Sequence, residues 1–187
     1  MAARGIRNNN PLNIRKTGIK WLGEILGSDN AFEQFQSLVY GLRAGMVNIK
    51  TYFGRGKNTI TEIITSWAPP SDGNNTKAYI KTVSERSGIP ANQKLTFDKK
   101  TIIPIVKAMV FVENGSDAGI TAETYEKAFD AIKDKTVKVD YLKYVLPLLV
   151  FFYSIGCFTA PLITNNTKNK DYVTKDKRFL PKTENRC

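Results

Sequence analysis

The sequence predicts a mainly α-helical globular domain with a small extended element near its start, followed by one transmembrane helix. Apolar residues recur at helical spacing between residues 38 and 132, no strand-rich stretch is present, and residues 144–163 carry no charged side chain. A chain of 187 residues is long enough for one ordinary domain with an appended segment. We expect the domain at 1–135, a charged linker at 136–143 and a basic polar tail at 164–187.

The chain opens with an asparagine-rich stretch, residues 4–23, with the sequence RGIRNNNPLNIRKTGIKWLG. Asn and Pro disfavour helix, and residues 14–21 have the pattern of two short extended pieces joined around Thr17 and Gly18. We therefore expect a turn-rich or hairpin-like segment that presents amides, guanidinium groups and one indole. Such groups can bind the hydroxyls and the ring face of a sugar. A polar loop without a ligand is the alternative.

Five helices are expected along the rest of the domain, at about 38–53, 60–67, 76–86, 99–112 and 121–132. Their ends are marked by capping residues. Thr59 followed by Glu62 is a capping-box pattern, and Asp98 is a suitable N-cap for the fourth helix. Gly115 suits the left-handed residue that ends the same helix.

Two features of these helices predict how they pack. The fourth helix, 99–112, is apolar nearly all round, which predicts a central and mostly buried position. In the first helix, Gly41 and Gly45 lie four residues apart on one side, where a neighbouring backbone could approach closely.

Residues 144–163, YVLPLLVFFYSIGCFTAPLI, form the predicted membrane segment. At about 1.5 Å per residue these 20 uncharged residues are just long enough to span a bilayer. A buried core helix kinked at Pro147 is the alternative. The tail at 164–187 has seven basic and three acidic residues, a net charge of +4. Both flanks of the segment are positive, so the positive-inside rule does not fix its orientation.

The composition restricts the chemistry that the chain could perform. Lys and Arg number 28 against 17 Asp and Glu, and the net charge of +11 suits nucleic acid, anionic lipid or the acidic polymers of a bacterial wall. The absence of histidine excludes Ser-His-Asp and Cys-His nucleophiles and His-rich zinc sites. An enzyme of this composition would use a carboxylate for acid–base chemistry. Cys157 and Cys187 form no metal-binding pattern, and no cofactor is expected.

Glu113 is the candidate catalytic carboxylate because it directly follows the long apolar helix and precedes Asn114 and Gly115. Partial burial, together with the negative end of the helix dipole, would favour the protonated carboxyl that a general acid requires. A solvated glutamate at a helix end is the alternative.

Seven motifs occur in order between residues 4 and 115: RGIRNNNPLNIR, W-L-G, F-x-x-F, G-L-R-A, T-I-x-x-I-I-x-x-W-A-P-P, N-x-T-x-x-Y-I and A-M-V-x-V-E-N-G. In this series the chain resembles a family of phage virion-associated peptidoglycan hydrolases. The resemblance implies an α+β, lysozyme-like or lytic-transglycosylase-like fold, in which a glutamate at the end of a central helix faces an Asn-rich segment across a cleft. Here the Asn-rich segment precedes that helix, so the lysozyme-like arrangement would be permuted.

Carried over residue by residue, the resemblance implies that Glu113 is the general acid and base. It implies substrate contacts for two groups of side chains: Asn8, Asn9, Asn10 and Asn13, and the N-x-T-x-x-Y set of Asn74, Thr76 and Tyr79. Helix capping is the alternative role for Asn74 or Asn75, and core packing is the alternative for Tyr79. Trp21 and Trp67 are expected to be packing residues.

The number of carboxylates bears on the reaction type. Retaining and inverting glycosidases use two, and the candidates for a second are Glu24, Glu33 and Asp72. One carboxylate suffices for a lytic transglycosylase, in which the 6-hydroxyl of the sugar itself closes on the anomeric carbon. Non-hydrolytic cleavage of the MurNAc–GlcNAc linkage is therefore favoured over hydrolysis.

The resulting interpretation is a membrane-anchored virion enzyme that cuts the glycan strands of bacterial peptidoglycan as the virus enters its host. Its expected partners are peptidoglycan, a lipid membrane through 144–163 and other virion proteins through the basic tail, without a specific nucleic-acid site. The alternative is a non-enzymatic basic membrane protein of the virion that binds capsid or genome.

Overall fold

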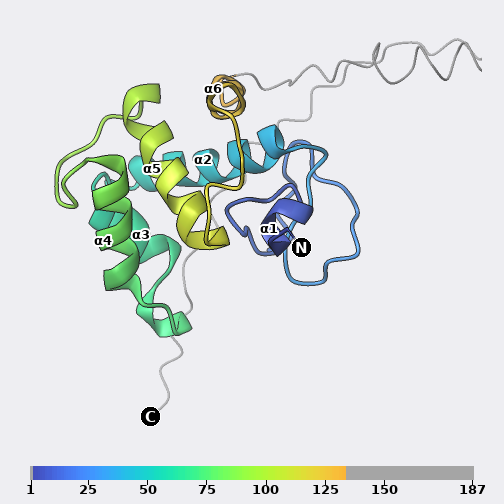
Figure 1. Cartoon of the computed structure of the whole chain (residues 1–187), viewed down its shortest axis with the longest axis horizontal. Coiled ribbons are helices and arrows are strands. Elements are labelled where there is room, and N and C mark those ends of the chain that lie inside the picture. Colours follow the sequence, from blue (N-terminus) through green and yellow to red (C-terminus); the bar gives the residue numbers. More distant parts are fainter. Residues whose placement is uncertain (1, 134–187) are drawn as a thin grey trace, which may run out of the picture. The chain divides into compact units, whose positions relative to one another are not determined.

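A computed structural model describes residues 2–133 of the chain. This part contains six α-helices and one 3-10 helix (Figure 1): α1 Arg4–Arg7, α2 Leu38–Gly54, α3 Ile60–Trp67, η1 Pro70–Asp72, α4 Thr76–Ser87, α5 Lys99–Asn114 and α6 Ala122–Asp130. The predicted mainly α-helical domain is confirmed. The five predicted helices correspond to α2–α6, with ends that agree to within about two residues.

Capping residues fix the helix ends as the sequence predicted. The Thr59 side chain accepts from the Glu62 amide, and the Glu62 side chain accepts from the Thr59 amide, which completes the capping box of α3. The Asp98 side chain accepts from the Thr101 amide at the start of α5. Gly115 ends α5 with a φ of 70°, a left-handed conformation that glycine adopts without strain.

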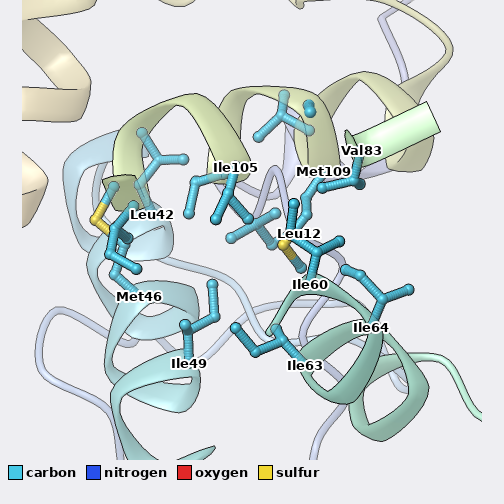
Figure 2. Close-up of a cluster of buried hydrophobic side chains, with 14 of the residues drawn as sticks. Leu12, Leu42, Met46, Ile49, Ile60, Ile63, Ile64, Val83, Ile105 and Met109 are labelled. Atoms are coloured by element: carbon cyan, nitrogen blue, oxygen red, sulfur yellow. The ribbon is translucent and has the colours of Figure 1, made fainter. Parts of the chain in front are cut away.

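Helix α5 is the centre of the core. Along it Ile102, Ile105, Val106 and Met109 are fully buried, and α4 and α6 pack against it. Figure 2 shows side chains from α2, α3 and α5 meeting in one cluster, joined by Leu12 from the N-terminal segment. The prediction that the apolar helix 99–112 is central and buried is confirmed.

The N-terminal segment folds differently from the prediction. Residues 4–7 form a short helix, and the turns at 8–9, 11–12 and 22–23 agree with the expected turn-rich segment. Residues 14–21 do not form a hairpin with each other, so the hairpin form of that expectation was wrong. Instead the 14–16 and 23–25 stretches both pair with 31–36, through antiparallel bridges Arg15–Phe32 and Glu24–Phe35. An isolated two-stranded hairpin is marginally stable, whereas pairing with 31–36 places Phe35 in a fully buried position.

Gly41 and Gly45 of α2 allow the N-terminal segment to lie directly on the helix. A β-carbon built on Gly41 would be 1.9 Å from the Asn9 carbonyl oxygen, and one on Gly45 would be 2.1 Å from Leu12 Cδ1. Neither position has room for a larger side chain. The predicted close approach at Gly41 and Gly45 is therefore confirmed, and its partner is the asparagine-rich segment itself.

Within residues 2–133, no helix combines the length and apolar character needed to cross a bilayer. The predicted membrane segment 144–163, the linker, the tail and both cysteines lie outside the described residues.

Candidate active site

The Glu113 carboxylate accepts three hydrogen bonds from neutral side chains. Asn13 Nδ2 donates to Oε2 at 3.0 Å. Trp67 Nε1 and the Tyr79 hydroxyl both donate to Oε1, at 3.1 and 2.9 Å. These three donors hold the carboxylate in position. Glu113 is half-buried, so part of the residue remains open to solvent.

Four separate parts of the chain meet at this carboxylate. Glu113 is the next-to-last residue of α5, Trp67 ends α3 and Tyr79 lies in the first turn of α4. Asn13 comes from the N-terminal segment and has a φ of 49°, a left-handed conformation that Asn tolerates better than most residues. Asn114 strengthens the junction by donating to the Pro11 carbonyl at 2.7 Å.

Tyr79 is a neutral hydrogen-bond donor at any ordinary pH. Its side chain is buried, and burial raises the pKa of the phenol well above its usual range; the nearby Glu113 charge and the hydrogen bond raise it further. The hydroxyl therefore keeps its proton and donates a hydrogen bond to Glu113 Oε1.

A cleft of about 360 Å³ opens beside the carboxylate. Its lining includes Asn74, Asn75, Tyr79, Thr82, Val112 and Glu113. The lining combines two amides and two hydroxyl groups with small apolar side chains, a mixture that suits a polar ligand with apolar faces, such as a sugar. Of the described residues that line the cleft, Glu113 is the only carboxylate. No cluster of His, Cys, Asp and Glu suited to a metal ion occurs among residues 2–133.

Comparison with known proteins places the chain in a phage family. No protein-family model matches it. Protein P5 of Pseudoalteromonas phage PM2 is 42% identical over 134 residues, which cover 69% of this chain and 81% of the phage protein. The chain belongs to the family of Protein P5. It is thus a homologue of a phage protein, and the phage part of the predicted resemblance is confirmed.

The structure brings only some of the predicted substrate-binding residues of this P5-family chain to Glu113. Asn13 and Tyr79 contact the carboxylate, and Asn74 lines the cleft, where its amide donates to the Pro69 carbonyl. Thr76 is buried and its hydroxyl donates to the Ala68 carbonyl at 2.6 Å. Asn75, the alternative cap, is the N-cap of α4. Substrate contact by Asn13, Asn74 and Tyr79 stays a prediction.

The run of three asparagines makes contacts within the protein instead. The Asn8 amide donates to Asp29, and the Asn9 amide donates to the Phe35 carbonyl. Asn10 is fully buried and donates to the carbonyls of Ile14 and Glu33. These three amides thus fasten the N-terminal segment, and none of them lines the cleft. Their contact with substrate stays a prediction.

The candidates for a second carboxylate have partners or surroundings of their own. Glu24 accepts from Lys20 and from the Trp21 amide, and Asp72 is exposed in η1. Glu33 is 3% exposed, and its burial, with the nearby charge of Glu24, raises the pKa of its carboxyl. None of the three is among the residues that line the cleft.

Trp67 is a site residue of this P5-family chain that the sequence did not predict, because it was expected only to pack. Its ring does contact the core, but its indole N–H is a donor to the candidate acid. The available signal was its position: it ends a helix and is followed by Ala68, Pro69 and Pro70, which begin the loop beside the cleft. An indole at such a junction can pack with its ring and donate with its nitrogen.

Proposed function

We propose that the chain cleaves the MurNAc–GlcNAc backbone of bacterial peptidoglycan, with Glu113 as the general acid and then the general base of a lytic transglycosylase reaction. The observation that carries this proposal is the Glu113 carboxylate at the edge of a cleft, held by Asn13, Trp67 and Tyr79. A single acid with fixed geometry is what one-carboxylate glycan cleavage requires.

In the proposed first step, protonated Glu113 gives its proton to the glycosidic oxygen as the bond from that oxygen to the anomeric carbon breaks. The carboxylate left behind accepts hydrogen bonds from three neutral donors that are already in place, which stabilises the charge as it forms. Oε1 accepts from both Trp67 and Tyr79, whereas Oε2 accepts from Asn13 alone, so Oε2 is the oxygen that carries the transferred proton.

In the proposed second step, the same carboxylate removes a proton from the 6-hydroxyl of the MurNAc sugar. The 6-oxygen then bonds to the anomeric carbon, so an anhydro sugar forms and Glu113 is protonated again. No second carboxylate and no water are consumed. The composition of the cleft lining supports this route over hydrolysis, because glycosidases that transfer to water place a second carboxylate about 5–9.5 Å from the first.

The relationship to Protein P5 supports a role in a phage. A virion enzyme that opens the host wall, anchored by 144–163, remains part of the proposal. The net charge of +11 would favour contact with an anionic wall.

The test is a zymogram on purified peptidoglycan with the full chain and two variants. Glu113→Gln replaces the carboxyl group with an amide that cannot donate a proton to the glycosidic oxygen. Glu126→Gln makes the same change at an exposed position on α6. We expect a clearing band with the wild type and with Glu126→Gln, and none with a folded Glu113→Gln. Mass spectrometry of the fragments should show anhydro ends.

Three outcomes would contradict the proposal. Clearing by Glu113→Gln would place the acid elsewhere, and fragments with reducing ends would indicate hydrolysis. A folded wild type that clears nothing would favour a non-enzymatic phage protein.

A further inference from the structure

Exposed aliphatic side chains gather in one loop of the domain. Among the described residues, the large hydrophobic side chains that are exposed are Ile19 at 38%, Ile25 at 40% and Leu26 at 102%. All three lie within residues 15–28, here named the 15–28 loop. Single exposed aliphatics are common on protein surfaces, but three within eight residues, with none elsewhere on the described surface, form a local patch.

The loop has a defined conformation at its base. The bridges Arg15–Phe32 and Glu24–Phe35 fasten two points of it to the 31–36 stretch. Between them the Glu24 amide donates to the Trp21 carbonyl at 3.2 Å, which makes a turn. Ile19 precedes this turn, and Ile25 and Leu26 follow it. In Figure 1 the outermost part of the chain between α1 and α2 lies on the side of the domain away from α3 and α4.

Basic side chains flank the aliphatic ones. Arg15, Lys16 and Lys20 are exposed, whereas the single acid of the loop, Glu24, is largely covered and pairs with Lys20 at 3.1 Å. With three basic residues and one acid, the loop carries a net charge of +2. Exposed aliphatics beside lysines match the boundary of an anionic bilayer, where acyl chains lie beneath phosphate groups.

We propose that the 15–28 loop docks on an anionic lipid surface, with Leu26, Ile25 and Ile19 entering the headgroup–acyl boundary and the basic residues lying at the phosphates. This contact is separate from the predicted membrane segment 144–163 and does not depend on the activity of Glu113. A glycan would offer no apolar layer for Leu26. A stable protein interface would require about 20–30 residues a side, more than this loop supplies.

Trp21 is a probe within the loop. The chain has two tryptophans, so the full chain with Trp67→Phe reports on Trp21 alone. This protein is reconstituted in phosphatidylglycerol or phosphatidylcholine vesicles, with and without brominated acyl chains. Because residues 144–163 could insert in either lipid, the readout is bromine quenching of Trp21 and not vesicle binding.

We expect strong quenching in phosphatidylglycerol and at least threefold weaker quenching in phosphatidylcholine. Leu26→Asp and Lys16→Glu should each reduce the quenching in phosphatidylglycerol severalfold. Lys100→Glu makes the same charge change at an exposed position of α5 and should leave it unchanged.

Two results would overturn the inference. One is quenching that is absent in phosphatidylglycerol or equal in the Leu26→Asp variant. The other is a change in Trp21 emission that follows protein concentration without lipid, which would show that a second copy of the chain covers the patch.

Discussion

Asn13 and Glu113 lie 100 residues apart in the sequence and are joined by one amide, which donates to the Glu113 carboxylate at 3.0 Å and to its backbone carbonyl at 3.2 Å. The N-terminal segment is therefore bound to the end of the central helix at the candidate acid. The carboxylate would lose the Asn13 donor whenever this segment detached.

Replacement of Asn13 should separate the contribution of its amide from that of its left-handed backbone conformation. Asn13→Ala removes the amide and also places alanine at a φ of 49°, so we expect the free energy of unfolding to fall by at least about 2 kcal/mol and glycan cleavage to fall about tenfold or more. Asn13→Gly removes the amide without the backbone strain. It should be more stable than Asn13→Ala in urea denaturation yet equally slow. An active Asn13→Gly protein would show that the amide has no part in the reaction.

The two donors to Oε1 can be removed while an aromatic ring is kept at each position. Trp67→Phe and Tyr79→Phe should each lower kcat about tenfold, or about 1.4 kcal/mol, because each deletes a hydrogen bond to the charged form of Glu113. Trp67 does not line the cleft, so its variant should leave KM nearly unchanged. Steady-state rates on soluble glycan strands measure both values.

The double variant Trp67→Phe/Tyr79→Phe completes a double-mutant cycle for the two donors that share Oε1. Since both donors act on one atom, the combined loss should differ from the sum of the single losses by at least about 0.5 kcal/mol. Strict additivity, or a raised KM with an unchanged kcat in Trp67→Phe, would argue against a positioning role for the indole.

Local signals explain why the helices were predictable. Thr59 with Glu62, Asp98 and Gly115 mark ends that depend only on neighbouring residues, and the structure uses all of them. The burial of α5 follows from its apolar sequence. These features need no knowledge of distant parts of the chain.

The N-terminal segment was harder because its partners are distant. The 14–16 stretch pairs with residues 31–33, and Asn13 with Glu113. The run of asparagines suggested substrate contacts, but Asn10 is fully buried and serves the backbone. Asn9 and Asn13 have positive φ, which offers a second, conformational reason for asparagine here that a sugar-binding interpretation does not consider. Which amides face a ligand depends on the tertiary fold.

Gly41 should be required for the fit of the N-terminal segment on α2. A β-carbon there would be 1.9 Å from a backbone oxygen, which cannot rotate away, so Gly41→Ala should lower the free energy of unfolding by about 1–3 kcal/mol or more. The same variant should also slow cleavage, because a shift of the backbone at Asn9 would displace Asn13, four residues further along the segment, from Glu113. Gly54→Ala, in the same helix with nothing within 4 Å of the new atom, should be neutral or stabilising by up to about 1 kcal/mol. Equal effects of the two variants in urea denaturation would refute the close-packing argument.

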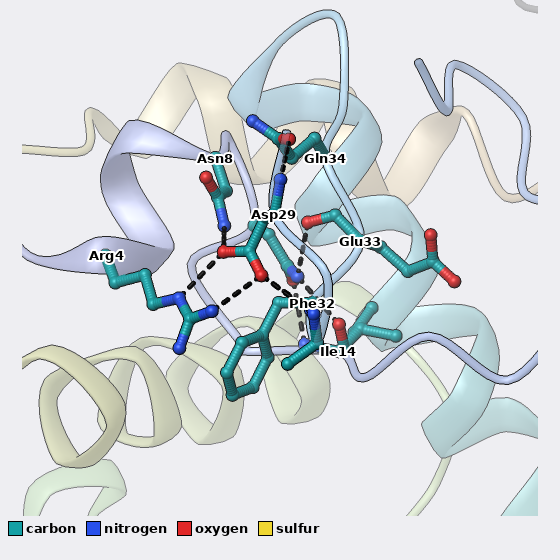
Figure 3. A network of polar contacts seen from close by, with 9 residues as sticks. Arg4, Asn8, Ile14, Asp29, Phe32, Glu33 and Gln34 are labelled. Atoms are coloured by element: carbon teal, nitrogen blue, oxygen red, sulfur yellow. Dashed lines mark hydrogen bonds and ion pairs between the residues drawn. The ribbon is translucent and has the colours of Figure 1, made fainter. Parts of the chain in front are cut away.

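Asp29 should make the attachment of the N-terminal segment sensitive to acid. Arg4 donates to both of its oxygens at 2.6 and 2.7 Å and Asn8 donates to one (Figure 3), and these contacts, the guanidinium first, hold the pKa of Asp29 well below its usual range. A depressed pKa means that the unfolded chain binds the proton more readily. The stabilisation is therefore complete above the unfolded value of about 3.9 and declines as the pH falls below it.

Asp29→Asn removes this titration. Urea denaturation from pH 7 to pH 3 should show a constant difference in stability between wild type and Asp29→Asn above about pH 5, and a shrinking difference below about pH 4. Arg4→Met deletes the guanidinium and should likewise reduce the acid sensitivity, because the carboxyl loses its principal partner. If the wild-type and Asp29→Asn curves stay parallel down to pH 3, the Arg4–Asp29 pair does not stabilise the folded protein, and the hold on the N-terminal segment rests on its asparagines and on Leu12.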